Sequence, residues 1–150
     1  MRLAAMSTPR RSSKAALALA LTLCACSGPP AAGTGEFPQD PLLALTSESG
    51  ALEVEVRTLP DQPPTRGDVS MQLAISDVQT GDPAVGLELQ VLPWMPAMGH
   101  GTSIQPTLFE SAPGIYQLDH LVLFMPGTWQ IRTELQGAVR DHVVPTLEIR

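Results

Sequence analysis

From Ala51 onward, apolar and polar residues alternate with a period of two along most of the chain. The alternating runs are 52–56, 69–75, 85–91, 116–124, 129–135 and 143–149. Successive side chains of a strand point to opposite faces of a sheet, so this pattern predicts strands that are buried on one face, as in antiparallel sheets. No stretch of this region has the longer period of an amphipathic helix. We therefore expect an all-β domain.

Turn-forming residues separate these runs, and their spacing indicates the architecture. Proline and glycine punctuate the chain at 60–67, 80–83, 113–114 and 126–127. About seven short strands over roughly 100 residues predict an immunoglobulin-like antiparallel β-sandwich. Pro145 falls inside the last run and lacks a backbone N–H, so that strand is expected at the edge of its sheet.

The first 25 residues have the features of an export signal. Basic residues precede the Ala/Leu-rich run 15–23, which is too short to cross a bilayer as a helix because that needs about 20 residues. The run ends in Leu23-Cys24-Ala25-Cys26, where a small residue precedes a cysteine. We interpret 1–25 as a lipoprotein signal peptide and Cys26 as the lipidated first residue of the mature protein. The alternative is ordinary cleavage near Ala25, which leaves Cys26 as a free thiol.

The residues after Cys26 indicate a tether and a location. Residues 26–48 are rich in Pro, Gly, Ser and Ala and are expected to form a flexible linker, with one apolar patch at 42–45 that is a candidate for the domain edge. Ser27 is not the aspartate that favours inner-membrane retention, so we expect an outer-membrane anchor facing the periplasm. Arg10-Arg11 is followed by Ser12-Ser13 rather than apolar residues, which disfavours the twin-arginine route. The folded domain is expected over 49–150.

The charge and cysteine content of the mature chain exclude several functions. Five arginines remain against fifteen carboxylates, a net charge of −10, which disfavours nucleic acid and anionic lipid surfaces and is compatible with a cationic partner. No lysine remains, which excludes Schiff-base and P-loop chemistry. Both cysteines lie at the processing site, so the domain is expected to have neither a disulfide nor a thiolate metal site.

One loop concentrates soft metal ligands. Met95, Met98 and His100 lie within six residues, in a segment broken by Pro96, Gly99 and Gly101, and Met125 precedes the later Pro126-Gly127 turn. Thioether and imidazole donors suit Cu(I), whereas a zinc site usually has more His, Cys or carboxylate ligands. These residues predict a copper site if the two turns converge. In the alternative interpretation the methionines fill the end of the sandwich and His100 is a solvated turn residue.

The remaining aromatic, histidine and methionine side chains are expected to have structural roles. We predict that Met71 and Trp129 are core residues, that His142 is on the surface, and that His120 is partly buried because it shares the parity of Tyr116. Trp94 is a candidate to shield a cation with its ring face or to pack at the sandwich end.

Catalytic signatures are missing from the sequence. Ser103 and Ser111 have no neighbouring His/Asp pattern, and no nucleophile elbow occurs. We therefore expect a protein that binds rather than one that catalyses. A non-metal envelope module that mediates protein–protein interaction is the alternative to metal handling.

Three motifs resemble those of the YtkA-like domain family, and FixH-like proteins have a similar ending. They are the Met95-Pro96-Ala97-Met98-Gly99-His100 loop, the Pro113-Gly114-Ile115-Tyr116 turn and the Met125-Pro126-Gly127-Thr128-Trp129 strand start. The similarity covers roughly 50–149. It implies an immunoglobulin-like sandwich in an exported or membrane-attached protein, with a link to copper handling or oxidase assembly, and it carries Met95, Met98, His100 and Met125 over as candidate ligands. A lipid anchor in place of a membrane helix distinguishes this chain from FixH-like proteins.

Overall fold

A computed structural model describes residues 35–137 and 140–150. The predicted signal peptide, Cys26 and the linker up to residue 34 lie outside the described residues. Within these residues every regular element is a strand, and no helix is long and apolar enough to cross a membrane. The ten strands are β1 (Leu43–Thr46), β2 (Leu52–Leu59), β3 (Gly67–Asp77), β4 (Glu88–Met95), β5 (His100–Gly101), β6 (Thr107–Ala112), β7 (Ile115–Leu123), β8 (Gly127–Gln136), β9 (Arg140–Val143) and β10 (Thr146–Ile149).

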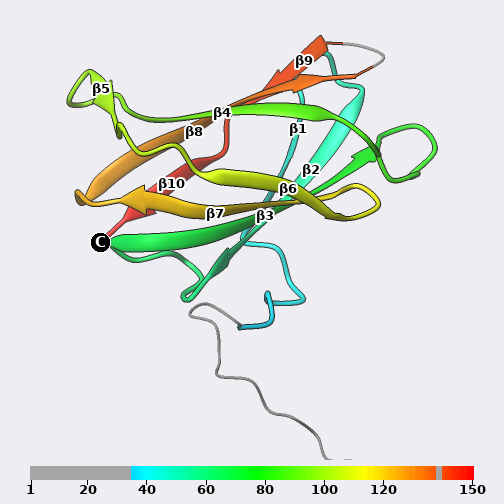
Figure 1. The fold of residues 1–150 in the computed structure, drawn as a ribbon. Helices are drawn as coiled ribbons and strands as arrows, with labels where there is room; N and C mark the ends of the chain where they lie inside the picture. Colours follow the sequence, from blue (N-terminus) through cyan, green and yellow to red (C-terminus); the bar gives the residue numbers. More distant parts are fainter. Residues whose placement is uncertain (1–34, 138–139) are drawn as a thin grey trace, which may run out of the picture. The chain divides into compact units, whose positions relative to one another are not determined.

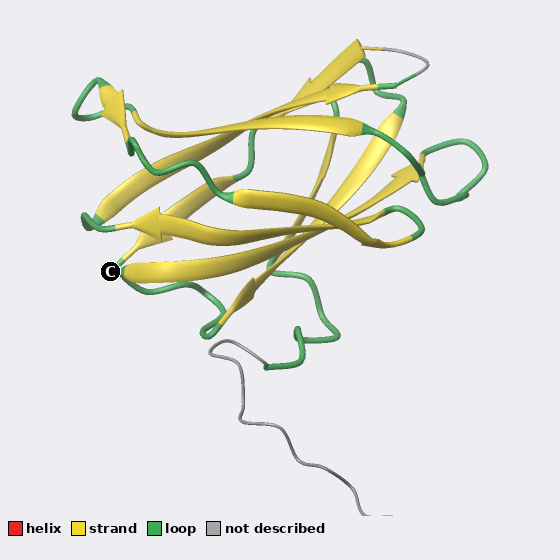
Figure 2. Ribbon diagram, viewed as in Figure 1, coloured by secondary structure: helices red, strands yellow, loops and turns green. Residues whose placement is uncertain are grey.

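The strands form two antiparallel sheets that face each other across one apolar core (Figures 1 and 2). The first sheet has the order β1-β2-β3-β7-β6 and the second the order β10-β8-β4-β5, with β9 also paired to β8. Apart from β1, β5 and β9, this order matches the A-B-E-D and G-F-C sheets of an immunoglobulin domain. The predicted immunoglobulin-like β-sandwich is confirmed, although it has ten strands rather than about seven.

Pro145 divides the last predicted strand into two. β9 pairs with the second half of β8 and β10 with the first half, both on the same side, so together they form one interrupted edge. The Pro145 carbonyl accepts a hydrogen bond from the Ile131 N–H at 2.8 Å. The predicted edge position is confirmed, because a residue without an N–H is tolerated where its missing donor would face solvent.

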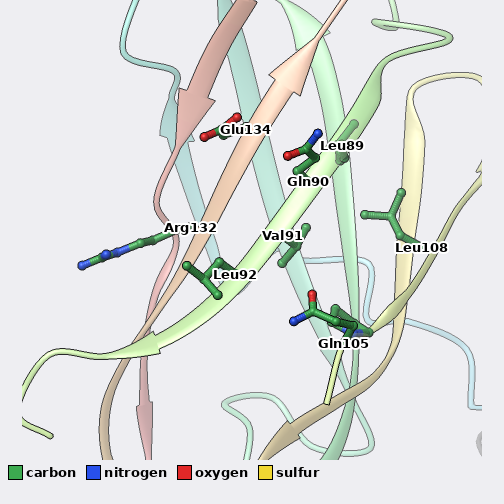
Figure 3. A pocket seen from close by; sticks show the side chains of 9 residues that line it. Leu89, Gln90, Val91, Leu92, Gln105, Leu108, Arg132 and Glu134 are labelled. Atoms are coloured by element: carbon green, nitrogen blue, oxygen red, sulfur yellow. The ribbon is translucent and has the colours of Figure 1, made fainter. Parts of the chain in front are cut away.

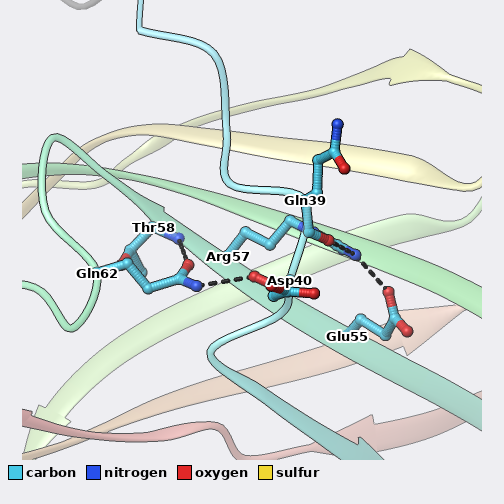
Figure 4. Close-up of polar contacts among 6 residues, drawn as sticks. All are labelled: Gln39, Asp40, Glu55, Arg57, Thr58 and Gln62. Atoms are coloured by element: carbon cyan, nitrogen blue, oxygen red, sulfur yellow. Dashed lines mark hydrogen bonds and ion pairs between the residues drawn. The ribbon is translucent and has the colours of Figure 1, made fainter.

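The segment that precedes β1 is tied to β2. The Arg57 guanidinium donates to the Gln39 carbonyl and pairs with Glu55 at 2.7 Å, while the Gln62 amide donates to the Asp40 carbonyl (Figure 4). β1 then pairs with β2 from Leu43 to Thr46. The apolar patch at 42–45 thus joins the sheet edge, and the sheet starts within the range assigned to the linker.

A β-bulge in β7 overturns the expected position of His120. The pairing of β3 with β7 shifts register where Asp119 and His120 lie opposite Ser70, and His120 has a φ of 60°. Beyond the bulge the inward parity moves by one residue, so Leu121 and Leu123 are buried instead of Val122 and Phe124. An inserted residue in the left-handed conformation produces this shift. The predicted partial burial of His120 is wrong: its side chain is 68% exposed and contacts Asp68 at 2.9 Å.

The start of β4 also differs from the prediction. The alternating run begins at Val85, but the strand begins at Glu88 and Val85 is exposed. A loop replaces the first residues because Gly86 has a φ of 67° and the buried Tyr116 hydroxyl binds this segment from both sides. That hydroxyl donates to the Ala84 carbonyl at 2.7 Å and accepts from the Leu87 N–H at 2.9 Å.

Candidate metal-binding rim

The four candidate ligands Met95, Met98, His100 and Met125, here called the rim, lie at one end of the sandwich. β4 ends at Met95, and a short loop leads to β5, where His100 is opposite Met95 in register. β8 begins at Gly127 beside the end of β4, since Trp94 pairs with Gln130. The β4–β5 hairpin and the β7–β8 turn therefore reach the same end (Figure 1).

A direct contact links the two turns. A Cβ added to Gly127 would lie 2.8 Å from the Met95 Cε methyl, so the end of the Met95 side chain lies against Gly127, where the β7–β8 turn enters β8. Gly127 has a φ of 123°, a conformation that favours glycine. The absence of a side chain at this position gives the Met95 side chain the space it occupies.

The rim residues divide into a buried pair and an exposed pair. Met95 is 5% exposed and belongs to the core, and Met125 is partly buried against the core. Met98 is 55% exposed, and His100 is exposed with its Nδ1 3.1 Å from the Gly101 carbonyl oxygen. Met95 thus fills the end of the sandwich, as expected in the alternative interpretation without a metal, whereas Met98 does not.

The loop between Met95 and His100 has a defined backbone. The Met95 carbonyl accepts hydrogen bonds from the N–H groups of Met98 and Gly99, at 3.1 and 3.0 Å. Gly99 has a φ of 68°, which turns the chain back into β5. A hydrogen-bonded turn holds the backbone of Met98 and His100 beside the buried Met95.

Two further motifs of the sequence, Pro113–Tyr116 and Met125–Trp129, connect loops to the core. In the Pro113–Tyr116 motif, Gly114 approaches the Ile75 carbonyl so closely that an added Cβ would lie 2.8 Å from it, and Tyr116 holds the loop before β4. In the Met125–Trp129 motif, the buried Trp129 indole donates to the Met125 carbonyl at 2.9 Å and meets the Phe124 ring edge-to-face. The prediction that Trp129 is a core residue is confirmed, and its indole positions the Met125 turn.

The remaining side chains singled out in the sequence are not part of the rim. Met71 is fully buried in β3, and His142 is on the surface beside Glu48 at 2.9 Å, so both predictions are confirmed. The ring face of Trp94 is occupied by a protein cation, because the Arg132 guanidinium lies 4.8 Å from the ring centroid. Among residues 35–137 and 140–150, no group of three or more His, Cys, Asp or Glu side chains is placed to hold a metal.

A buried carboxylate at the β1–β2 turn was not recognised in the sequence. Asp141 of β9 is 7% exposed and accepts hydrogen bonds from the Ser49 hydroxyl at 2.5 Å, the Ser49 N–H at 3.1 Å and the His142 N–H at 2.8 Å. Burial alone raises the pKa of Asp141, but these bonds and one from Ser47 outweigh burial and lower its pKa to about 2. Nothing in the residues around Ser49 or around Asp141, 92 positions later, indicates that these two side chains come into contact.

Replacing Asp141 by asparagine is expected to lower the free energy of unfolding at pH 7 by about 1–3 kcal/mol, because hydrogen bonds to a charged acceptor are lost. The pKa of Asp141 is lower in the folded state than in the unfolded state, so its contribution is present above about pH 4 and is lost as the pH falls toward 2. Urea unfolding of both proteins from pH 7 to pH 2 should show the difference shrinking. The control Glu48→Gln, at an exposed side-chain contact with His142, should cost less than about 1 kcal/mol. A difference that is constant with pH would contradict the assignment.

Comparison with known proteins agrees with the motifs at the rim. The family model described as YtkA-like matches residues 46–134, from the end of β1 into β8, and so includes the β4–β5 hairpin and the β7–β8 turn. No curated protein and no solved structure matches the chain. The matched region covers more than half of the chain and contains all four rim residues and all three motifs. The chain belongs to the YtkA-like family.

Proposed function

We propose that this protein is a lipid-anchored envelope protein that binds Cu(I) at the rim, to buffer the ion or to transfer it. The observation that carries the proposal is the packing of Met95 against the turn that follows Met125, with Met98 and His100 on the adjoining hairpin. Three thioethers and an imidazole at one end of a domain without cysteine form a donor set that suits a soft monovalent cation. The role is one of binding rather than catalysis.

The division of the rim by burial supports a particular order of events. Met98 and His100 are accessible to solvent and are the residues that a copper ion would meet first, while Met95 and Met125 offer sulfur at the edge of the core. An apolar environment around thioether ligands favours Cu(I) over the harder Cu(II) ion. The domain's net charge of −10 also attracts cations to its surface.

The test is a competition titration of Ala31–Arg150, which contains all ten strands and the described core, with Cu(I) and a chromogenic chelator. Replacing all three rim methionines by leucine and His100 by alanine removes the donors, and leucine approximates the volume of methionine so that the core stays packed. We expect the Cu(I) affinity to fall by at least about 100-fold, which corresponds to a loss of about 2.7 kcal/mol in binding free energy. Met71→Leu removes a buried methionine from β3 and should leave the affinity unchanged. Equal affinity of the rim variant and the native domain would refute the site.

The anchor is tested separately from copper binding. Lipidation at Cys26 adds apolar chains whose burial contributes about 0.8 kcal/mol per methylene, and several chains together give stable membrane attachment. The full-length protein should fractionate with outer membranes, and Cys26→Ser should not be processed at Ala25 or carry lipid. Mass spectrometry of the mature N-terminal peptide measures this, and an unmodified Cys26 would show that the signal is cleaved in the ordinary way.

A further inference from the structure

One side of β4 has no partner strand along most of its length. On one side β4 pairs with β8 from Glu88 to Trp94, but on the other side β5 pairs only with Trp94 and Met95. In residues 35–137 and 140–150, no strand pairs with Glu88–Pro93 on that side. This open edge faces β6, the outermost strand of the opposite sheet.

The register identifies the backbone groups that this edge presents. The Ile131 N–H donates to Pro145, so the backbone groups of Ile131 point away from β4. The direction of the backbone N–H and C=O groups alternates from one residue of a strand to the next. The backbone groups of Arg132 and Glu134 therefore point toward β4, where these residues pair with Leu92 and Gln90. 

The intervening residues of β4 therefore direct their backbone groups to the open edge. These residues are Leu89, Val91 and Pro93. Pro93 agrees with this parity, because a proline is tolerated only where no donor to β8 is needed. The Pro93 carbonyl lies against Gly101, because a Cβ added to Gly101 would overlap its oxygen. The edge thus offers the N–H and C=O groups of Leu89 and Val91, an arrangement that an additional strand can bind.

A hollow of about 640 Å³ lies beside this edge. Its apolar wall comes from Leu89 and Val91 on β4 and from Leu108 on β6, and Gln105 and Pro106 complete it on the loop before β6. In Figure 3, Leu108 points from β6 toward β4, and Arg132 and Glu134 of β8 also line the hollow. The hollow can take apolar side chains from a strand placed on the edge.

We propose that the Leu89–Pro93 edge of β4 binds an extended segment of a partner polypeptide as an added strand. Alternate side chains of this segment enter the hollow and are apolar, and those between them lie on the outer face of the sheet. The outer-face residues are basic. Glu88 and Glu134 lie on that face, the one cation there among these paired residues, Arg132, is already placed over the Trp94 ring, and the domain carries a net charge of −10. The same charge disfavours a second copy of this chain on the edge.

The probe is a blocked heptapeptide that alternates lysine and valine, added to ¹⁵N-labelled Ala31–Arg150. We expect saturable binding and at least a tenfold slower exchange of the Val91 amide, whose N–H has no strand partner among the described residues. The Gln90 and Leu92 amides, already bonded to β8, should change little. A peptide of the same composition with its valines consecutive should bind less, which separates strand addition from attraction between opposite charges.

Two further changes remove the backbone hydrogen bonds between the edge and the peptide, one by a substitution in the protein and one by a modification of the peptide. Val91→Pro deletes an edge donor that β8 does not use, and we expect it to weaken peptide binding at least tenfold, whereas Gln90→Ala on the outer face should not. N-methylation of the peptide at alternate residues blocks the same bonds and does not depend on folding of a variant. Unchanged Val91 exchange at peptide saturation, or equal binding of the N-methylated peptide, would overturn the proposal. Sedimentation that shows a dimer without peptide would assign the edge to a second copy instead.

Discussion

Replacing Trp129 by alanine is expected to lower the free energy of unfolding by about 3–5 kcal/mol, the cost of removing a large buried aromatic side chain. Trp129 is fully buried, its ring meets Phe124 at a centroid distance of 5.9 Å, and its indole N–H donates to the Met125 carbonyl. The substitution leaves a cavity at the start of β8 and frees the turn that carries Met125. Urea denaturation monitored by circular dichroism measures the loss.

Trp129→Phe separates the two contributions of this side chain. It keeps an aromatic ring in the core but leaves the Met125 carbonyl without its indole donor, which is expected to cost about 1–3 kcal/mol. If the indole positions the β7–β8 turn, this variant should also bind Cu(I) more weakly than the native domain. A Trp129→Ala domain as stable as the native one would contradict the placement of Trp129 in the core.

Replacing Gly114 by alanine is expected to lower the free energy of unfolding by about 2–5 kcal/mol. About 1–2 kcal/mol comes from the left-handed backbone, since Gly114 has a φ of 71°. The rest, about 1–3 kcal/mol, comes from overpacking, because the new Cβ would lie 2.8 Å from both the Ile75 carbonyl oxygen and Pro83 Cβ. The Ile75 carbonyl cannot move freely, as it accepts the Ala84 N–H at 2.9 Å.

Gly81→Ala is the matched control for this prediction. Gly81 has a φ of 75°, nearly the same as that of Gly114, but a Cβ there would meet nothing within 4 Å. It should therefore cost only the backbone contribution, about 1–2 kcal/mol. Thermal or urea unfolding of the two variants measures the difference, and equal destabilisation would show that close approach is not the reason for glycine at position 114.

Strands that bury one face can be predicted from the sequence, because their apolar residues alternate. Strands that bury neither face cannot. β2, β3 and β8 alternate regularly and were predicted from their apolar residues. β6 was missed because it is an edge strand whose side chains are nearly all exposed, so it has no apolar stripe. The two-residue β5 is too short to have a period, and it depends on the turn that follows Met95.

Local backbone conformation caused the specific errors. The parity of β7 changes at His120 because one residue adopts a positive φ, which nothing in the residue types around it requires. The loss of Val85 from β4 depends on the Tyr116 hydroxyl, which comes from a strand 31 residues later. Both are tertiary effects that a window of neighbouring residues does not contain.

The amino-acid sequence by itself determined the all-β class, the edge position of the strand with Pro145 and the family motifs, because each depends on residue type and spacing alone. Only the tertiary structure decided the depth at which each rim side chain lies and the side of β4 that is left open. Met95 and Met98 are methionines three residues apart, yet Met95 packs against Gly127 in the core and Met98 is in solvent. Burial depends on which distant segment lies opposite, and that is a property of the assembled sheets.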